Sequence, residues 1–185
     1  MRADLVPDDL WERVAPLLPP APERRLRCPG RLRVPDRAAL AGIMCVLRTG
    51  VAWRDVPSEA VGCSGVTAWR RLRDWTEADV WPRLHTALLT ELRRADLVDL
   101  DGCAVDCSHV RALKGGIMSA PRPSTAPASA PSAHVIVDRC GTPRAVTLTG
   151  NRNDVTQLLP LLDAIPPIRG LRLRCRPRRL FADRG

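Results

Sequence analysis

Two aspartates, Asp106 and Asp183, each follow a short apolar segment of the sequence. The segments are Cys103–Val105 and Leu180–Ala182. A buried strand has a rigid backbone, so an aspartate at its carboxyl end is held in a fixed position at the rim of the sheet. Carboxylate oxygens are the hard ligands that Mg²⁺ and Mn²⁺ prefer. On neighbouring strands the two aspartates would form a divalent-metal site.

A second kind of metal site is zinc bound by Cys103, Cys107 and His109. On a strand these three side chains share the face opposite Asp106. The seven cysteines are an odd number without a CxxC pair, which argues against a zinc ribbon and a secreted disulfide framework. We favour a buried apolar face that uses cysteine as a small hydrophobic residue, with reduced thiols.

The charged residues favour a polyanionic partner, of which nucleic acid is the commonest. Lys114 is the only lysine among 29 basic residues, and 20 acidic residues leave a net charge of +9. Residues 1–100 carry 16 basic and 14 acidic residues, whereas residues 101–185 carry 13 and 6. Arginine binds phosphate through a planar fork. An arginine-rich genome composition is the alternative, and it does not explain the asymmetry between the halves.

The first hundred residues have the apolar spacing of amphipathic helices. Helices are expected to begin at Pro7 and at Pro35, the second ending near Gly50. A third begins after Ser64, an expected N-cap, and a fourth covers about residues 77–95. The expected inward side chains of the second helix are Leu40, Ile43, Met44 and Leu47; of the third, Val66, Trp69, Leu72 and Trp75; of the fourth, Trp81, Leu84, Leu88 and Leu92.

Three arginines of the third helix, Arg70, Arg71 and Arg73, lie off its expected inward stripe. Such a helix fits the DNA major groove and its flanking phosphates, and the preceding helix and turn would complete a helix-turn-helix. The alternative is a solvated face of a packing helix. A second arginine cluster precedes Asp183, and we interpret it as a phosphate contact rather than a solvated loop. Its candidate DNA-binding members are Arg172, Arg174 and Arg176.

After residue 100 the periodicity changes to that of strands. The expected order is a strand, a hairpin, a helix that contains Pro160, and a last strand. The ranges are Cys103–His109, His134–Asp138 with Pro143–Thr149, Asn153–Ile165, and Leu180–Ala182. Asp138 is most simply a hairpin residue. The sequence shows neither an N-terminal signal pattern nor a run of ~18 apolar residues, so we expect a soluble, cytoplasmic protein without a membrane partner.

Six motifs together resemble the DDE transposases of bacterial insertion sequences, in the group that includes insertion-sequence family five. They are Leu10-Trp11 with Leu17–Pro20, Arg48–Pro57, Val66–Leu72, Ala104–Ala112, Gly150–Val155 and Ala182–Gly185. The resemblance implies a ribonuclease-H-like fold and three acidic residues that hold two divalent ions, Mg²⁺ or Mn²⁺. By position in the motifs, Asp106 matches the first acid and Asp183 the second, which makes them the candidate catalytic and metal-binding residues.

The resemblance also implies a domain organisation of mixed class, α+β or α/β. Residues 1–97 would form an all-helical, helix-turn-helix-like domain that binds the terminal inverted repeats of the element. Residues 98–185 would form an incomplete ribonuclease-H-like domain. The third acid, a glutamate on a later helix, has no counterpart, because the sequence stops two residues after Asp183. We therefore expect an inactive, truncated N-terminal part of a transposase. Whether it forms a homodimer is left open.

Residues 117–133 depart from this pattern, because they are almost entirely Ala, Pro and Ser. Such a composition predicts disorder, and we suspect that a frameshift produced it. Two other functions stay open at this stage. One is a non-catalytic DNA-binding module or decayed remnant; the other is an RNA-associated basic protein, which fits the charge but not the paired aspartates.

Overall fold

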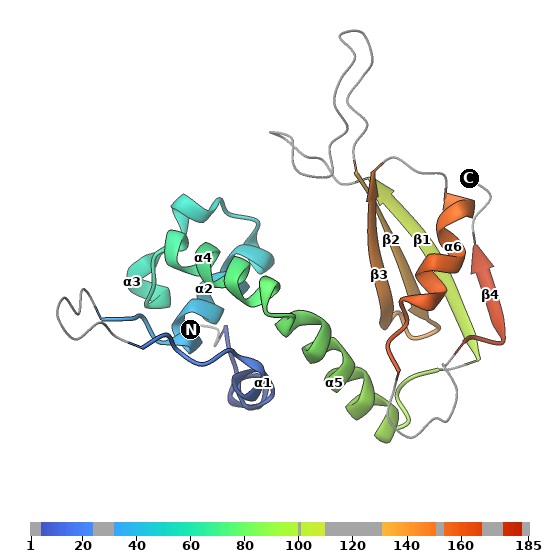
Figure 1. The fold of residues 1–185 in the computed structure, drawn as a ribbon, viewed down its shortest axis with the longest axis horizontal. Coiled ribbons are helices and arrows are strands. Elements are labelled where there is room, and N and C mark those ends of the chain that lie inside the picture. Colours follow the sequence, from blue (N-terminus) through green and yellow to red (C-terminus); the bar gives the residue numbers. More distant parts are fainter. Residues whose placement is uncertain are drawn as a thin grey trace, which may run out of the picture. The chain divides into compact units, whose positions relative to one another are not determined.

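A computed structural model of the chain describes residues 5–23, 32–99, 101–109, 131–150, 154–167 and 176–182. The chain divides into two compact units, Met1–Ala87 and Leu88–Gly185. Figure 1 shows helices in the first; the second contains a sheet, the helix that packs on it, and the end of the helix Val80–Arg94, which begins in the first unit. The domain limits expected at residues 97 and 98 stay a prediction, because compactness alone does not define a folding domain. None of the described helices combines the length and apolarity needed to cross a membrane.

The helical unit follows the expected order of helices. Its elements are α1 (Asp8–Val14), η1 (Ala15–Leu17), α2 (Asp36–Thr49), η2 (Trp53–Asp55), α3 (Ser58–Val61), α4 (Gly65–Glu77) and the start of α5 (Val80–Arg94). Gly50 ends α2 in the left-handed conformation, with φ of 70°, as is common for a helix-ending glycine. The Ser64 hydroxyl accepts a hydrogen bond from the Thr67 amide at 3.3 Å, which confirms the expected N-cap of α4.

Small residues bring α2 and α4 close together. A Cβ added to Gly42 of α2 would lie 2.8 Å from the Ala68 Cβ, and one added to Gly65 would collide with the Trp53 carbonyl oxygen. Trp75 is 1% exposed beside them and packs edge-on against Trp81. The buried core of this unit is Val6, Val14, Ala39, Leu40, Ile43, Cys63, Ala68, Trp75 and Val80.

The expected inward stripe of α4 is wrong for two of its four members. Val66 is 53% exposed and Trp69 45% exposed, because the close contact with α2 and η2 uses Gly65 and Ala68 instead. Hydrophobicity predicted that the larger side chains of α4 face the core, whereas close packing of the backbones requires the small ones there. Leu47, expected on the inward face of α2, is likewise 69% exposed.

The fourth expected helix differs in its start and in its buried positions. Asp79, with φ of 54°, separates α4 from α5, so α5 begins at Val80. Val80 and Leu89 are its fully buried side chains. The four expected inward residues are only half-buried: Trp81, Leu84, Leu88 and Leu92.

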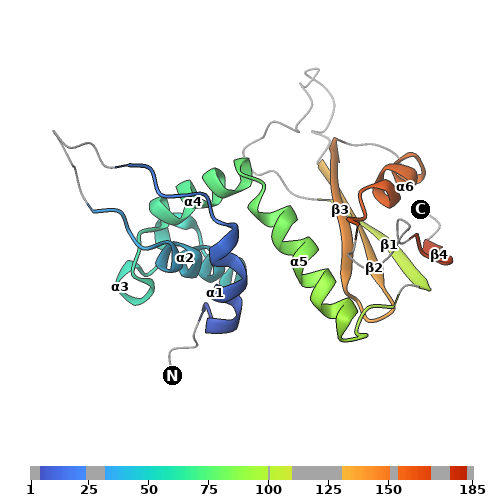
Figure 2. The same cartoon turned by 60° about the horizontal axis from the view of Figure 1, so that its bottom comes forward.

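The described part of the second unit contains a four-stranded mixed sheet, and its strands and helix follow the predicted order along the chain. Its elements are β1 (Gly102–His109), β2 (Pro131–Asp138), β3 (Pro143–Gly150), α6 (Asp154–Asp163) and β4 (Arg179–Ala182). The spatial order is β3-β2-β1-β4; β1 pairs with β2 and β2 with β3 antiparallel, whereas β1 and β4 are parallel (Figures 1 and 2). Residues 117–130 of the expected disordered segment lie outside the described residues, but residues 131–133 belong to β2, which corrects that end of the prediction.

Helix α6 packs on one face of this sheet. The buried residues between them are Cys103, Ile136, Ala145, Leu161 and Ile165. On the opposite face Val146, Leu148 and Phe181 are 54%, 58% and 60% exposed. The strand register places Asp106 on that same face, because Ala104 pairs with Phe181 and side chains alternate along β1. We call it the open face of the sheet.

Asp138 stabilises the hairpin from within. Its side chain is 3% exposed, and its Oδ1 accepts hydrogen bonds from the amides of Cys140 and Thr142 at 2.9 and 2.8 Å. Its Oδ2 accepts a third from the Asp99 amide at 3.2 Å. The expected role of Asp138 as a hairpin residue is therefore confirmed, and the same carboxylate also holds the segment that leads into β1.

Candidate functional site

Asp106 lies on β1 and is exposed on the open face of the sheet. Its Oδ1 accepts a hydrogen bond from the Cys107 amide at 2.8 Å. The parallel neighbour β4 pairs Ala182 with Val105, and each of these residues directly precedes one of the two aspartates in the sequence. Asp183 itself lies outside the described residues, so the proximity of the two carboxylates stays a prediction.

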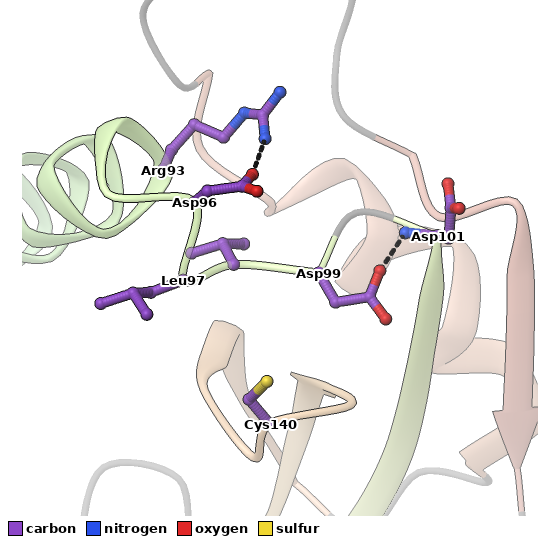
Figure 3. Close-up of a pocket in the computed structure, with 7 residues that line it drawn as sticks. Arg93, Asp96, Leu97, Asp99, Asp101 and Cys140 are labelled. Carbon is purple, nitrogen blue, oxygen red and sulfur yellow. Dashed lines mark hydrogen bonds and ion pairs between the residues drawn. The ribbon is translucent and has the colours of Figure 1, made fainter.

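Three other acids gather between α5 and β1, in a pocket of about 490 Å³ that Cys140 also lines. Figure 3 shows that the carboxylates of Asp96 and Asp99 are engaged locally. Asp96 contacts Arg93 at 3.3 Å, and Asp99 accepts a hydrogen bond from the Asp101 amide at 2.8 Å. Their contacts hold this turn in place, and in the described parts of the chain no three His, Cys, Asp or Glu side chains are arranged to hold a metal ion.

The three arginines of α4 have different surroundings. The Arg71 side chain is 14% exposed, and its Nε donates to Asp36 Oδ1 at 3.0 Å. Arg33 donates to the same carboxylate at 3.0 Å, so Asp36 links the start of α2 to α4. Arg73 is half-exposed; it contacts Asp74 at 3.0 Å, and its guanidinium lies 5.5 Å from the centre of the Trp69 ring.

Arg70 is exposed and forms no ion pair with another described residue. It lines a pocket of about 740 Å³ at the start of α4, together with Arg33 and Arg71. The Ser64 and Thr67 side chains belong to the same pocket. Glu59 also lines it, and Arg33 and Arg71 are paired with Asp36. Arg70, together with the hydroxyl groups and the helix N-terminus, is suited to an anion such as a phosphate group.

Comparison with known proteins matches both units of the chain. A family model described as "Putative transposase of IS4/5 family" covers residues 6–85, and one described as "Transposase DDE domain" covers residues 101–185. The "Insertion element IS402 uncharacterized 16.2 kDa protein" of Burkholderia cepacia is 55% identical over 117 residues, which are 63% of this chain and 79% of that protein. The chain belongs to the IS4/5 family of insertion-sequence transposases.

A second relative is similar to a shorter stretch of this IS4/5-family chain. The "Putative transposase for insertion sequence element IS402" of Burkholderia cepacia is 66% identical over 55 residues, 28% of this chain and 26% of that protein. No solved structure gives a significant match. The helical region followed by a mixed sheet with one helix is consistent with part of a ribonuclease-H-like DDE domain.

Two further expectations for this IS4/5-family chain are only partly covered by the described residues. Arg172 and Arg174 lie outside them, and Arg176 contacts Asp163 Oδ1 at 2.7 Å. Cys103, one of the three candidate zinc ligands, is 1% exposed in the sheet core, and its sulfur accepts a hydrogen bond from Arg144 at 3.2 Å. The side chain of His109 is not among those described.

Sequence reasoning missed the exposed pair Val66 and Trp69, which lie beside Arg70 on α4. The available signal was the small size of Gly65 and Ala68, three residues apart, of which Gly65 meets η2 and Ala68 meets α2. Sequence reasoning also missed Cys63, which lines the pocket at the start of α4. Burial raises the pKa of its thiol above the ordinary value, and a hydrogen bond with the Gly42 backbone lowers it by less. Cys63 is therefore a core thiol rather than a reactive one.

Proposed function

We propose that this chain binds the ends of its insertion sequence, and that Asp106 and Asp183 hold the metal ions used for DNA strand cleavage and transfer. The observation that carries the proposal is the parallel pairing of β1 with β4, in which Val105 pairs with Ala182. Parallel strands in register keep successive residues side by side. In the sequence, the next residue on each strand is one of the two aspartates.

The donor chemistry at Asp106 fits Mg²⁺ or Mn²⁺. Its carboxylate is exposed, and among the described residues its hydrogen-bond partner is the Cys107 amide, so it offers hard oxygen ligands to solvent. When bound, such ions activate water or a 3′ hydroxyl and stabilise the leaving oxygen. Asp106 would bind a metal ion through a carboxylate that is held in a fixed place, because the antiparallel pairing of β1 with β2 restrains its backbone.

DNA binding is assigned to the helical unit, in a helix-turn-helix-like arrangement formed by α2, the connection over residues 50–64 and α4, which packs against α2 at Gly42 and Ala68. Arg70 and Arg73 are exposed on α4, and the pocket at its start suits a phosphate group. Arg172, Arg174 and Arg176 are proposed to contact phosphates near the metal ions, because they precede β4 in the sequence. Terminal inverted repeats of the element are the proposed double-stranded partner.

Strand cleavage is proposed to need a third acid beside Asp106 and Asp183, because the family's chemistry uses three acids to fix both ions. Two-metal catalysis requires each ion to be held in a defined geometry.

The test compares Asp106→Asn with Asp101→Asn, an exposed acid on the same unit that contacts Arg178 at 3.7 Å. Mn²⁺ binding is measured by electron paramagnetic resonance, and element-end DNA binding by gel shift in EDTA. We expect Asp106→Asn to weaken Mn²⁺ binding by at least about tenfold and to leave DNA binding unchanged. Asp101→Asn should resemble the wild type in both assays. Equal Mn²⁺ affinity in all three proteins would overturn the metal assignment.

A further inference from the structure

Helix α4 exposes large apolar side chains next to arginines. Val66 and Trp69 are 53% and 45% exposed, although valine and tryptophan stabilise a fold most when they are buried. Residues three and four apart on a helix share one side. We call the side so formed the α4 stripe: Val66, Trp69, Arg70 and Arg73.

The charged members of the α4 stripe favour a polyanionic occupant. Arg70 has no ion pair with another described residue, and Arg73 is held over the Trp69 ring by a cation–π contact. The pairs of Arg73 with Asp74 and Glu77 are exposed contacts of 3.0 and 3.8 Å, which solvent screens and which cost little to exchange for phosphate.

The pocket at the start of α4 lies next to the stripe and shares Arg70 with it. A phosphate bound there would fix the helix N-terminus against a DNA backbone, as in helices that enter the major groove. In that groove the one apolar group on the base edges is the C5-methyl of thymine. An exposed valine and tryptophan flanked by arginines match this combination of methyl groups and phosphates.

We infer that Val66 and Trp69 read thymine methyl groups in the element ends, while Arg70 binds an adjacent phosphate. The inference rests on the proposed function, because it specifies how α4 recognises the DNA. It also separates the arginines by role: Arg70 contacts DNA, whereas Arg71 is held by Asp36 and positions α4.

The test uses the full chain and a duplex of the terminal inverted repeat, in which each thymine is replaced singly by deoxyuridine. This replacement removes only the methyl group. At one or two positions we expect the wild type to bind about fourfold more weakly, the effect of one lost methyl contact. The Val66→Ala variant should bind the thymine and deoxyuridine duplexes equally well at one of these positions. The affinity losses caused by the protein substitution and by the base replacement should therefore not be additive.

Leu47→Ala is the matched control, because Leu47 is 69% exposed on α2 and lies outside the stripe. This variant should keep the full response to deoxyuridine. Trp69→Ala should lose more affinity than Val66→Ala, but it also frees Arg73, so Val66→Ala is the cleaner probe. Thermal melts of each variant would show that the helical unit still folds.

The outcomes separate the inference from the proposed function. If the wild type prefers the element end over a shuffled duplex but binds every deoxyuridine duplex equally well, methyl reading is overturned and the proposed function stands. Loss of a dimer in Val66→Ala, with the deoxyuridine response intact, would assign the stripe to a second copy of the chain and also overturn the inference. The absence of any preference for element ends would overturn the proposed function itself.

Discussion

Both units leave large apolar side chains exposed, but in different surroundings. Val66 and Trp69 stand beside arginines on a helix whose other side packs into a core of nine buried residues. Val146, Leu148 and Phe181 lie on the open face of a sheet, where the buried cluster against α6 has five residues. Arginines beside an exposed apolar pair favour a polyanionic ligand, whereas an apolar sheet face without such charges favours association with another apolar surface.

The aromatic residues allow the two units to be observed separately. All five tryptophans lie at positions 11–81, within the helical unit, and the chain has no tyrosine. Tryptophan fluorescence therefore reports unfolding of the helical unit, and amide hydrogen exchange of β1 to β3 reports the sheet. If the comparison between the units is correct, changes in one core should leave the signal of the other intact.

The largest effect is expected for Gly65→Ala, which tests the close packing of the helical unit. The new methyl group would collide with the Trp53 carbonyl oxygen, and such overpacking should cost about 3 kcal/mol of unfolding free energy. Urea denaturation followed by tryptophan fluorescence measures it. Gly50→Ala is the control, because no atom lies within 4 Å of its added Cβ; its left-handed backbone should cost only about 1 kcal/mol. Equal losses would contradict the packing argument.

A smaller effect is expected in the sheet unit for Asp138→Ala. This change removes a buried carboxylate that accepts hydrogen bonds from three backbone amides, and it should cost about 2 kcal/mol. Faster amide exchange in β2 and β3 would report the loss. Asp163→Ala, at a half-exposed acid of the same unit, serves as the control. Unchanged exchange in both variants would mean that the hairpin is stable without this carboxylate.

Arg71→Ala and Arg70→Ala should separate stability from DNA binding within one helix. Loss of the Arg71–Asp36 pair, 14% and 22% exposed, should cost about 1 kcal/mol in urea denaturation. Arg70→Ala should leave stability unchanged and flatten the slope of log affinity against log salt by about 0.9, the effect of one lost phosphate contact. The same slope change in both variants would contradict this division.

The smallest effect concerns thiol reactivity in the two units. Cys140 is exposed, whereas Cys63 is buried and its pKa is raised. The thiolate is the reactive form, so near pH 8 iodoacetamide should modify Cys140 on the order of tenfold faster. Because the pKa of Cys63 is raised, its thiolate fraction should increase only at pH values above the ordinary pKa of a thiol. Peptide mass spectrometry gives both rates, and the difference should vanish in guanidinium.

Local patterns predicted most of the elements correctly. Apolar spacing and Pro35 gave α2, the hydroxyl of Ser64 gave the start of α4, and the break between the apolar runs 134–138 and 143–149 gave the β2–β3 turn. The alternation along β1 placed Cys103 and Asp106 on opposite faces, which agrees with their burial. These features depend on residues within a few positions of each other, so the sequence contains them directly.

Long-range contacts decided the rest. Which side of α4 faces inward depends on where Gly42 and Trp53 approach it, and neither is a neighbour in sequence. The same contacts decide that Arg71 binds Asp36 while Arg70 stays exposed, although the two are adjacent and chemically identical. The sequence by itself determined the family motifs, the strands, and the helices other than α3, η1 and η2. Tertiary structure decided which side chains remain exposed, because shape complementarity between distant segments outweighs hydrophobicity where backbones pack closely.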